Sequence, residues 1–242
     1  DEHHLRTLAE TIRKNFNAAF YNEATHHYGE GKQGADVFAL AFGLVPDGKR
    51  EKVFAALLGH LEKVNYHFDT GILATPLLLQ VLTENGRADL AYKLMNQRDF
   101  PSYGYLADKK NNTLWETWNG DGNDEGCGHC HPMFGSVVAW FYHSLAGIKP
   151  DQSDPGMKHF YIEPMIVPDL KYCRATYDSQ YGKISSDWKI DENGNLNIKI
   201  EVPANTSATV IIPDWGGRTV LESGKPVSEV SNIVTDKEDS AW

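Results

Sequence analysis

Residues 111–135 bring several chemically capable side chains into one short segment. The run NNTLWETWNGDGNDEGCGHCHPMFG holds a carboxylate, Glu116, between Trp115 and Trp118. An indole ring offers an apolar face on which the C–H side of a sugar can stack, and partial desolvation makes a carboxylate among such rings a more effective base. Glycosidic bond hydrolysis normally needs two carboxyl groups. The residue types alone leave a purely structural turn equally open.

The same segment also carries ligands for a soft metal ion. Cys127, His129, Cys130 and His131 lie close together, but zinc ligands usually arrive as two separated pairs because the chain must wrap around a tetrahedral ion. With no second pair, we favour a glycine-rich structural loop over a zinc site, and we expect no metal and no cofactor. A cysteine nucleophile assisted by His131 is a further alternative, without a third group to orient it.

The residues around this segment alternate between two kinds of helical pattern. An enclosed helix is apolar on every side, whereas an outer helix has one apolar stripe. The alternation favours hairpins of a partial α/α toroid over a plain helical bundle. A closed toroid of this type has about twice the number of helices, so half the ring is expected to be missing. One-striped helices are expected at 3–20, 49–64 and 87–97, and fully apolar ones at 34–45, 72–83 and 133–147.

Long polar loops lead from outer to inner helices and should emerge on one face, where binding groups are expected. Gln33, Asp36, His67 and Asp69 fall on this face and could bind sugar hydroxyls. Their alternative roles are a helix-dipole partner for Asp36 and a turn cap for Asp69. Four further histidines are expected to be exposed rather than functional: His3, His4, His26 and His27.

After Pro155 the apolar residues follow the alternating pattern of β-strands. GNLNIKIEVP places four apolar residues on one face, and Asn193 and Gly194 before it form a hairpin-turn signal. Further strands are expected at 158–167, 208–213 and 218–234. The sequence thus predicts a mainly α plus β chain with two domains: a helical domain at 1–154 and an antiparallel β-sandwich at 155–242.

Composition narrows the class of protein. The 242 residues are 41% hydrophobic, as in a folded domain, and carry a net charge of −10, which argues against a nucleic-acid partner. No apolar run approaches the roughly 20 residues that span a bilayer. Three cysteines cannot all pair with one another. The compartment and the oligomeric state stay open, and a signal segment upstream would favour a secreted or periplasmic protein.

Several separated motifs, in order, resemble one enzyme family. The runs are YGEGKQGADVFALAFGLVP, HFDTGILATPLLLQVLTENGRADLAYKLM, PSYGYLADKKNNTLWETWNGDG, HPMFGSVVAWFYHSLAGIKPD and PGMKHFYIEP. Together they are similar to the distal half of the catalytic domain of family-78 glycoside hydrolases, the α-L-rhamnosidases. The resemblance covers about residues 1–170 closely. The β domain that follows is similar to the C-terminal sandwich of these enzymes.

The resemblance implies a six-hairpin (α/α)6 barrel that hydrolyses terminal α-L-rhamnosyl residues with inversion. It implies Glu116 as general base and His131 as a sugar contact. The further substrate-binding residues expected, from their types and positions alone, are Trp115, Trp118, Gln33 and Asp69. The family's general acid lies in the first half of the barrel, so the chain alone is expected to be inactive or nearly so. Three acids could in principle substitute: Asp121, Asp124 and Glu125.

Two short stretches depart from the family pattern. Asn112 and Thr113 stand where the family usually has Thr-Thr, and Pro132 and Met133 follow the histidine in place of an aromatic and a small residue. Neither change removes a proposed catalytic group. An alternative to an enzyme is a non-catalytic carbohydrate-binding or structural remnant of one, and a longer reading frame upstream would separate the two.

Overall fold

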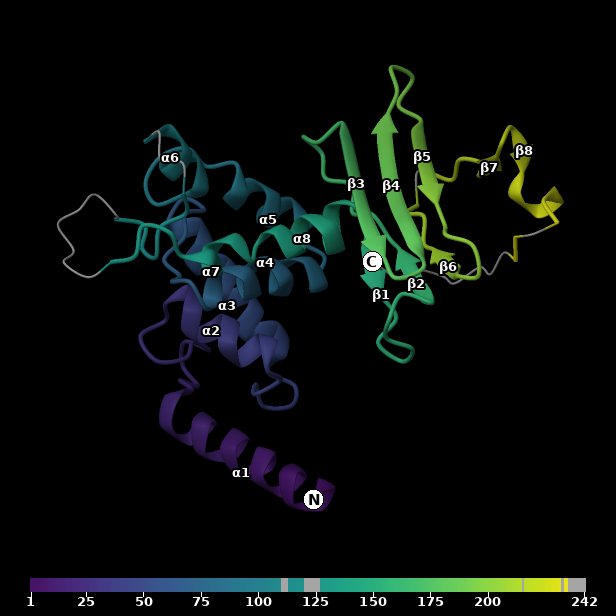
Figure 1. Ribbon diagram of the computed structural model, residues 1–242. Coiled ribbons are helices and arrows are strands. Elements are labelled where there is room, and N and C mark those ends of the chain that lie inside the picture. Colours follow the sequence, from purple (N-terminus) through teal and green to yellow (C-terminus); the bar gives the residue numbers. More distant parts are fainter. Residues whose placement is uncertain (110–112, 120–126, 215, 232, 235–242) are drawn as a thin grey trace. The chain divides into compact units, whose positions relative to one another are not determined.

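The computed structural model describes residues 1–109, 113–119, 127–214, 216–231 and 233–234 (Figure 1). The chain forms two compact units, Asp1–Ser144 and Leu145–Trp242, and each is described by itself. The division falls earlier than the boundary expected at 154/155, because the residues after the last helix already form a strand. The first unit is helical and the second consists of small β-sheets.

The helical unit follows the predicted order of helices. Its first five helices agree closely with the ranges expected from hydrophobic periodicity. The expected long helix at 133–147 is instead three short pieces, the last of them a π-helical turn at Phe141–Leu145. The helices are α1 (Glu2–Phe20), α2 (Gln33–Ala41), α3 (Arg50–Lys63), α4 (Ala74–Glu84), α5 (Ala88–Met95), α6 (Tyr103–Asp108), α7 (Pro132–Gly135) and α8 (Val138–Trp140).

The core of the helical unit lies between α2, α3, α4 and α5. α2 and α4 pack against each other, α3 packs on α2, and α5 packs on α4. α3 buries a single stripe, Val53, Leu57 and Leu61, whereas α4 buries residues around most of its circumference. This difference confirms the predicted division into outer and inner helices. Each fully buried Leu contributes about 1.5–3 kcal/mol relative to an exposed one.

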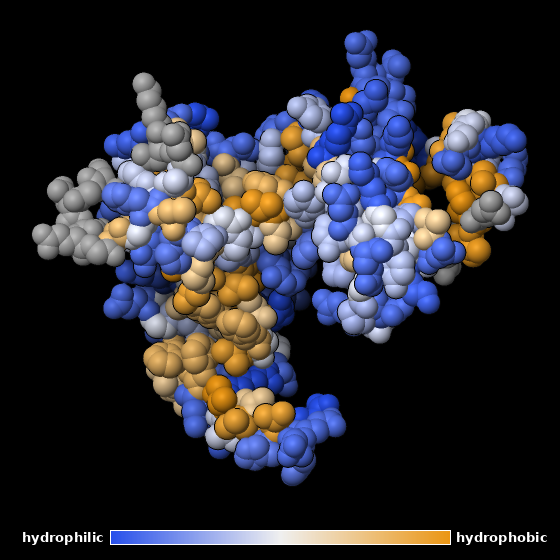
Figure 2. Space-filling model, viewed as in Figure 1, coloured by the Kyte–Doolittle hydropathy of each residue, from blue (hydrophilic) through white to orange (hydrophobic). Residues whose placement is uncertain are grey.

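α1 differs from the other long helices because none of its residues is buried. Two polar side chains in its second half attach it to the loop after α2. The Arg13 guanidinium donates to the Val45 carbonyl at 2.6 Å, and the Asn17 amide donates to the Leu44 carbonyl at 2.7 Å. Figure 2 shows apolar side chains gathered over α1 and α2. The apolar stripe of α1 therefore faces outward.

The second unit contains two three-stranded sheets and a short hairpin. Its strands are β1 (Ile148–Pro150), β2 (His159–Ile162), β3 (Tyr172–Ser179), β4 (Gly182–Ile190), β5 (Leu196–Glu201), β6 (Ser207–Val210), β7 (Leu221–Glu222) and β8 (Lys225–Pro226). One sheet has the order β3-β4-β5 and is antiparallel throughout. The other has the order β1-β2-β6, and its β2–β6 pair is parallel. The expectation of a wholly antiparallel domain was therefore wrong for this pair.

The central strand β4 fixes the buried face of its sheet. Ser186 and Trp188 point to this face and are fully buried. The Ser186 hydroxyl donates to the Ala146 carbonyl, and the Trp188 indole donates to the Leu145 carbonyl, both at 2.7 Å. The turn into β5 has Gly194 at φ 73°, a conformation that glycine adopts without strain. The predicted hairpin turn is thereby confirmed.

Candidate active site

Two extended segments of the helical unit lie side by side and carry the proposed catalytic residue. The Glu116 N–H donates to the Gly128 carbonyl at 2.9 Å, and the His131 N–H donates to the Leu114 carbonyl at 2.8 Å. Between these two hydrogen bonds, the first segment spans two residue steps, from 114 to 116, and the second spans three, from 128 to 131. The second segment thus carries one extra residue between the two hydrogen bonds, and its chain bends at His129 and Cys130.

Glu116 is half-buried and held by the opposite segment. The Gly128 N–H donates to Glu116 Oε2 at 2.9 Å, so the same glycine binds both the backbone and the carboxylate of Glu116. A Cβ atom at position 128 would lie 3.2 Å from this oxygen. No described residue donates to the other oxygen, Oε1. The carboxylate is thus fixed in place with one oxygen free for water or substrate.

Trp118 is the structural anchor of this segment. Its indole N–H donates to the Thr70 carbonyl at 2.7 Å, and its ring stacks on Phe68 with centroids 5.2 Å apart. Phe134 lies 4.3 Å from it and Tyr103 meets it edge-on at 5.2 Å. Burial raises the pKa of Tyr103 well above the ordinary value of a tyrosine. Trp118 retains 8% of its surface exposed, so most of its ring is committed to packing.

Trp115 lies on the other side of Glu116 and is also largely buried. Its ring is tilted against the exposed His129, with centroids 5.0 Å apart. The chain bends at Glu116 and Thr117 and turns at Trp118, so the two tryptophans pack against different parts of the unit. Trp115 is covered on one side by the opposite segment, and Trp118 by the helical core.

His131 stands immediately before α7 and is half-buried. Its Nδ1 atom is the only buried side-chain polar atom of the described residues that lacks a hydrogen-bond partner. A buried polar atom without a partner costs about 1–3 kcal/mol, and such atoms are rare in native proteins. The ring of His131 also lies close to Gly128, the residue that holds Glu116.

Gln33 and Asp69 bind each other rather than facing outward. The Gln33 N–H donates to Asp69 Oδ1 at 3.0 Å, and the Asp69 N–H donates to Gln33 Oε1 at 3.1 Å. The Gln33 amide also donates to the His67 carbonyl at 2.7 Å, and the side chain is fully buried. His60 Nε2 lies 2.6 Å from the second oxygen of Asp69. These contacts make both residues part of the frame that holds the loop before α4.

Asp36 is also held by hydrogen-bonding groups of this chain. Its carboxylate is fully buried and accepts a hydrogen bond from the Tyr28 N–H at 2.8 Å, and His27 Nδ1 lies 2.6 Å from its second oxygen. Burial raises the pKa of Asp36, although both partners act in the opposite direction. His27 is therefore a partner of a buried acid. This corrects the expectation that it is simply exposed, while His3 and His4 are exposed as expected.

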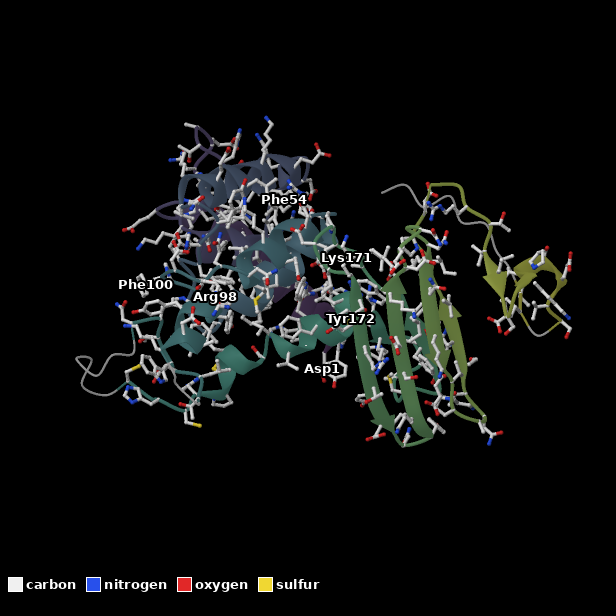
Figure 3. The ribbon with its side chains drawn as sticks, turned by 90° about the horizontal axis from the view of Figure 1, so that it is seen from above. Asp1, Phe54, Arg98, Phe100, Lys171 and Tyr172 are labelled. Carbon is white, nitrogen blue, oxygen red and sulfur yellow. The ribbon has the colours of Figure 1, made fainter. Side chains whose placement is uncertain are left out.

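His67 pairs with Asp99, which lies between the labelled residues Arg98 and Phe100 before α6 (Figure 3). The His67 Nε2 and Asp99 Oδ1 atoms are 2.8 Å apart. Burial alone would lower the pKa of His67, but the contact with Asp99 and the carbonyl of Val64 together raise it. The same contact lowers the pKa of the Asp99 carboxyl. The pair holds the loop before α4 against the segment before α6.

The structure brings the candidates of the sequence analysis into two connected groups. Gln33 and Asp69 hold the turn whose Thr70 carbonyl receives the Trp118 indole, and Glu116 and His131 are connected through Gly128. Sequence reasoning missed Gly128 because a glycine has no functional group of its own. It also missed His60, because nothing in its helical spacing relates it to Asp69.

The cysteines and histidines that suggested a metal site lie among the described residues. Among the described residues, which include Cys127, His129, Cys130 and His131, no group of three or more potential ligands is arranged to hold an ion. All three cysteines are free. Asp121, Asp124 and Glu125, the candidate substitute acids, lie outside the described residues. In the part of the chain that is described, no helix has the length and apolar character needed to cross a membrane.

Comparison with known proteins gives the same family for both units. Residues 1–145 match the family described as bacterial α-L-rhamnosidase 6 hairpin glycosidase domain. Residues 147–225 match the bacterial α-L-rhamnosidase C-terminal domain. An α-L-rhamnosidase of Streptomyces avermitilis is 37% identical over 208 residues, covering 84% of this chain and 20% of that protein. One from Formosa agariphila is 31% identical over 230 residues, covering 91% and 24%.

Solved structures agree with these relatives. A crystal structure of the Streptomyces avermitilis α-L-rhamnosidase complexed with L-rhamnose is similar with a TM-score of 0.80 and 36% identity, over 88% of this chain and 21% of that one. The α-L-rhamnosidase of Dictyoglumus thermophilum has a TM-score of 0.84 and 34% identity, over 96% and 26%. The chain thus spans about a quarter or less of these relatives' lengths. By both of its units, the chain belongs to the bacterial α-L-rhamnosidase family.

Proposed function

We propose that this chain is the distal part of an inverting α-L-rhamnosidase, which hydrolyses terminal α-L-rhamnosyl residues. The observation that carries the proposal is the fixed carboxylate of Glu116, held by Gly128 between two largely buried tryptophans. Relatives named α-L-rhamnosidase, one of them solved with L-rhamnose, support the choice of sugar.

Glu116 acts as the general base. Its Oε2 atom is oriented by the Gly128 N–H, so Oε1 can accept the proton of a water molecule that attacks the sugar. A base positioned in this way contributes about 10²–10⁴-fold to the rate. In an inverting enzyme the acid lies about 6.5–9.5 Å from the base, which leaves room for that water. The acid is supplied by a part of the protein that precedes this chain.

His131 contacts the sugar. Its ring is only partly buried and lies beside Gly128, the residue that orients Glu116, so the exposed part of the ring is available to a sugar hydroxyl. Trp115 forms a wall of the site beside Glu116. Trp118, which sequence analysis also assigned to substrate binding, acts mainly as the anchor of the segment. Gln33 and Asp69 act by holding the turn that receives Trp118.

The outward-facing apolar stripe of α1 supports the incompleteness of the helical domain. Leu5, Ile12 and Phe20 are each at least half exposed. Three hairpins can be counted from α1 to the last helical pieces, whereas the matched family is described as having six. The remaining hairpins would cover α1 and bring the acid toward Glu116. The chain by itself therefore has little or no turnover.

The test uses the longer protein that contains this chain. An aryl α-L-rhamnoside is the substrate, and proton NMR follows the first sugar released. We expect hydrolysis with β-L-rhamnose appearing first and the α-anomer growing in by mutarotation. Initial release of α-L-rhamnose would overturn inversion. A folded longer protein that binds L-rhamnose and hydrolyses no rhamnoside would support the non-catalytic alternative instead.

A further inference from the structure

Cys127 and Cys130 stand three residues apart in the segment that holds Glu116, and the proposed function uses neither of them. Both are free, with Cys130 exposed and Cys127 half-buried. Between them lie Gly128, which binds Glu116, and His129, which packs on Trp115. Any covalent link between the two sulfur atoms would enclose the residue that orients the carboxylate.

The backbone of this segment is already contracted. Residues 128–131 lie opposite residues 114–116, so three steps of one segment match two steps of the other. Two steps of a strand span about 7 Å, whereas three fully extended steps span about 10 Å. The chain also bends at His129 and Cys130. A disulfide needs Cα atoms roughly 4.4–6.8 Å apart, and the bend at His129 and Cys130 brings the two cysteines closer together than a fully extended chain would.

We propose that Cys127 and Cys130 form a reversible disulfide with each other when a disulfide oxidant, such as oxidised glutathione, is present. The bond would act as a thiol switch on the loop that orients Glu116. The switch on Glu116 rests on the proposed function, whereas formation of the disulfide does not. Cys-X-X-Cys pairs are a common arrangement for such exchange, since the second thiol lies within reach of the first.

The reaction proceeds by two thiol–disulfide exchanges. The exposed Cys130 thiolate attacks one sulfur of oxidised glutathione, forms a mixed disulfide and releases one glutathione thiolate. The Cys127 thiolate then attacks the Cys130 sulfur and releases the second glutathione. Two protein thiols are oxidised, one glutathione disulfide is reduced, and the two protons lost by the protein thiols pass through solvent to the two released glutathione thiolates. Reduced glutathione reverses both steps.

Closing this bond would disturb the hold on Glu116. Cys127 Sγ now lies 3.3 Å from Thr117 Oγ1 and must leave this contact to reach Cys130. The movement turns the peptide between Cys127 and Gly128, whose N–H donates to Glu116 Oε2. Losing that hydrogen bond would let the carboxylate move away from the attacking water. Displacements of about 1 Å in an active site can reduce a rate by about a hundredfold.

Cys173 provides an internal control. It lies in the second unit, on β3, and burial is the main cause that raises the pKa of its thiol. Less of it is therefore present as the reactive thiolate at neutral pH. Under the same oxidant, Cys173 should remain a thiol while the other two are oxidised.

The first experiment maps the thiols of the purified protein in glutathione buffers of increasing oxidised fraction, with N-ethylmaleimide as quench and peptide mass spectrometry as readout. We expect one reversible link between Cys127 and Cys130, with Cys173 alkylated. The Cys127→Ser variant should stop at a glutathione adduct on Cys130, and Cys173→Ser should behave as the unmodified protein. Persistent free thiols at 127 and 130, or a link to Cys173, would overturn the site.

The second experiment tests the effect on Glu116. Amide hydrogen exchange should change at 113–118 and 127–131 on oxidation, and kcat of the longer protein should fall by about tenfold to a hundredfold with a smaller change in KM. Reduction should restore both, and Cys130→Ser should abolish the redox dependence. Unchanged exchange in the disulfide-linked protein would overturn the switch. A longer protein without rhamnosidase activity would count against the proposed function alone, because the thiol map does not depend on it.

Discussion

α1 and α3 carry the same kind of amphipathic pattern but bury very different amounts of it. Leu57 in the stripe of α3 is fully buried, whereas Leu5 in the stripe of α1 is 61% exposed. α3 packs on α2 and buries its stripe, whereas none of the residues of α1 is buried. An amphipathic pattern thus identifies the side of a helix that needs a partner. It does not say whether that partner lies within the same stretch of chain.

The surface beside α1 shows what such a partner would meet. Phe16, Phe20, Phe38 and Phe42 line an apolar hollow of about 360 Å³ between α1 and α2. It lies over other elements than the Glu116 segment, in which Trp118 and Glu116 are held by groups of this chain. The two regions therefore differ in what holds them: the Glu116 segment is attached by hydrogen bonds, whereas the apolar surface beside α1 stays open to solvent among the described residues.

The largest stability effect should distinguish the two leucines. Leu57→Ala removes a fully buried side chain and should lower the free energy of unfolding by about 2–5 kcal/mol. Leu5→Ala, the matched change on α1, should alter it by only about 0.5 kcal/mol. Chemical denaturation of the purified chain measures both. Equal losses at the two positions would mean that α1 is covered in solution, and would contradict the comparison.

A smaller effect is expected at the anchor of the site segment. Trp118→Phe keeps a ring in the aromatic cluster but removes the donor to the Thr70 carbonyl, which is then left without its partner. We expect a loss of about 1–3 kcal/mol. Trp115→Phe is the control, because the Trp115 indole N–H makes no hydrogen bond to a described residue. Similar losses of stability in the two variants would mean that Trp118 anchors the segment no more than Trp115 does.

The smallest effect concerns the His67–Asp99 pair. Because the folded protein raises the pKa of His67, the pair contributes stability that is fully present below about pH 6.5, the ordinary histidine value, and is lost as pH rises through the raised pKa. The lowered pKa of Asp99 sets the other limit, since the contribution is lost again as pH falls through that value.

The Asp99→Asn variant tests this pH dependence. Its stability should differ from that of the unmodified protein in the mildly acidic range and converge with it at alkaline pH. A pH series of thermal unfolding measures the difference, and NMR titration of the His67 ring should give a lower pKa in the variant. A difference that grows toward alkaline pH would contradict the sign of the effect.

Much of the helical unit could be predicted because local patterns determine helices. The periodicity from 3 to 97 gave five helices within a few residues of their observed ends. The single helix predicted at 133–147 was not observed. Its apolar run forms three short helical pieces, and a strand begins directly after it at Ile148. The parallel β2–β6 pair was missed for a related reason. Strand alternation identifies a strand but not its partner or direction.

The site was predictable only in part. Glu116 stood out because a carboxylate between two tryptophans is an unusual combination, and family resemblance gave it a role. The contacts that fix it come from Gly128 and from the two backbone hydrogen bonds between the segments, which arise from tertiary pairing. Gln33 and Asp69 were expected on the loop face as possible contacts for sugar hydroxyls. Their hydrogen bonds to each other, however, depend on a fold that brings residues 36 positions apart together.

The most direct test of the account is turnover of Glu116→Gln in the longer protein. Glutamine keeps the size of the side chain and an oxygen for the Gly128 N–H, so the segment should remain folded, but it cannot accept a proton. We predict a fall in kcat of about 10²–10⁴-fold with little change in KM, while Glu201→Gln on the exposed edge of β5 leaves both unchanged. Near-normal turnover by Glu116→Gln would contradict the assignment of Glu116 as the general base.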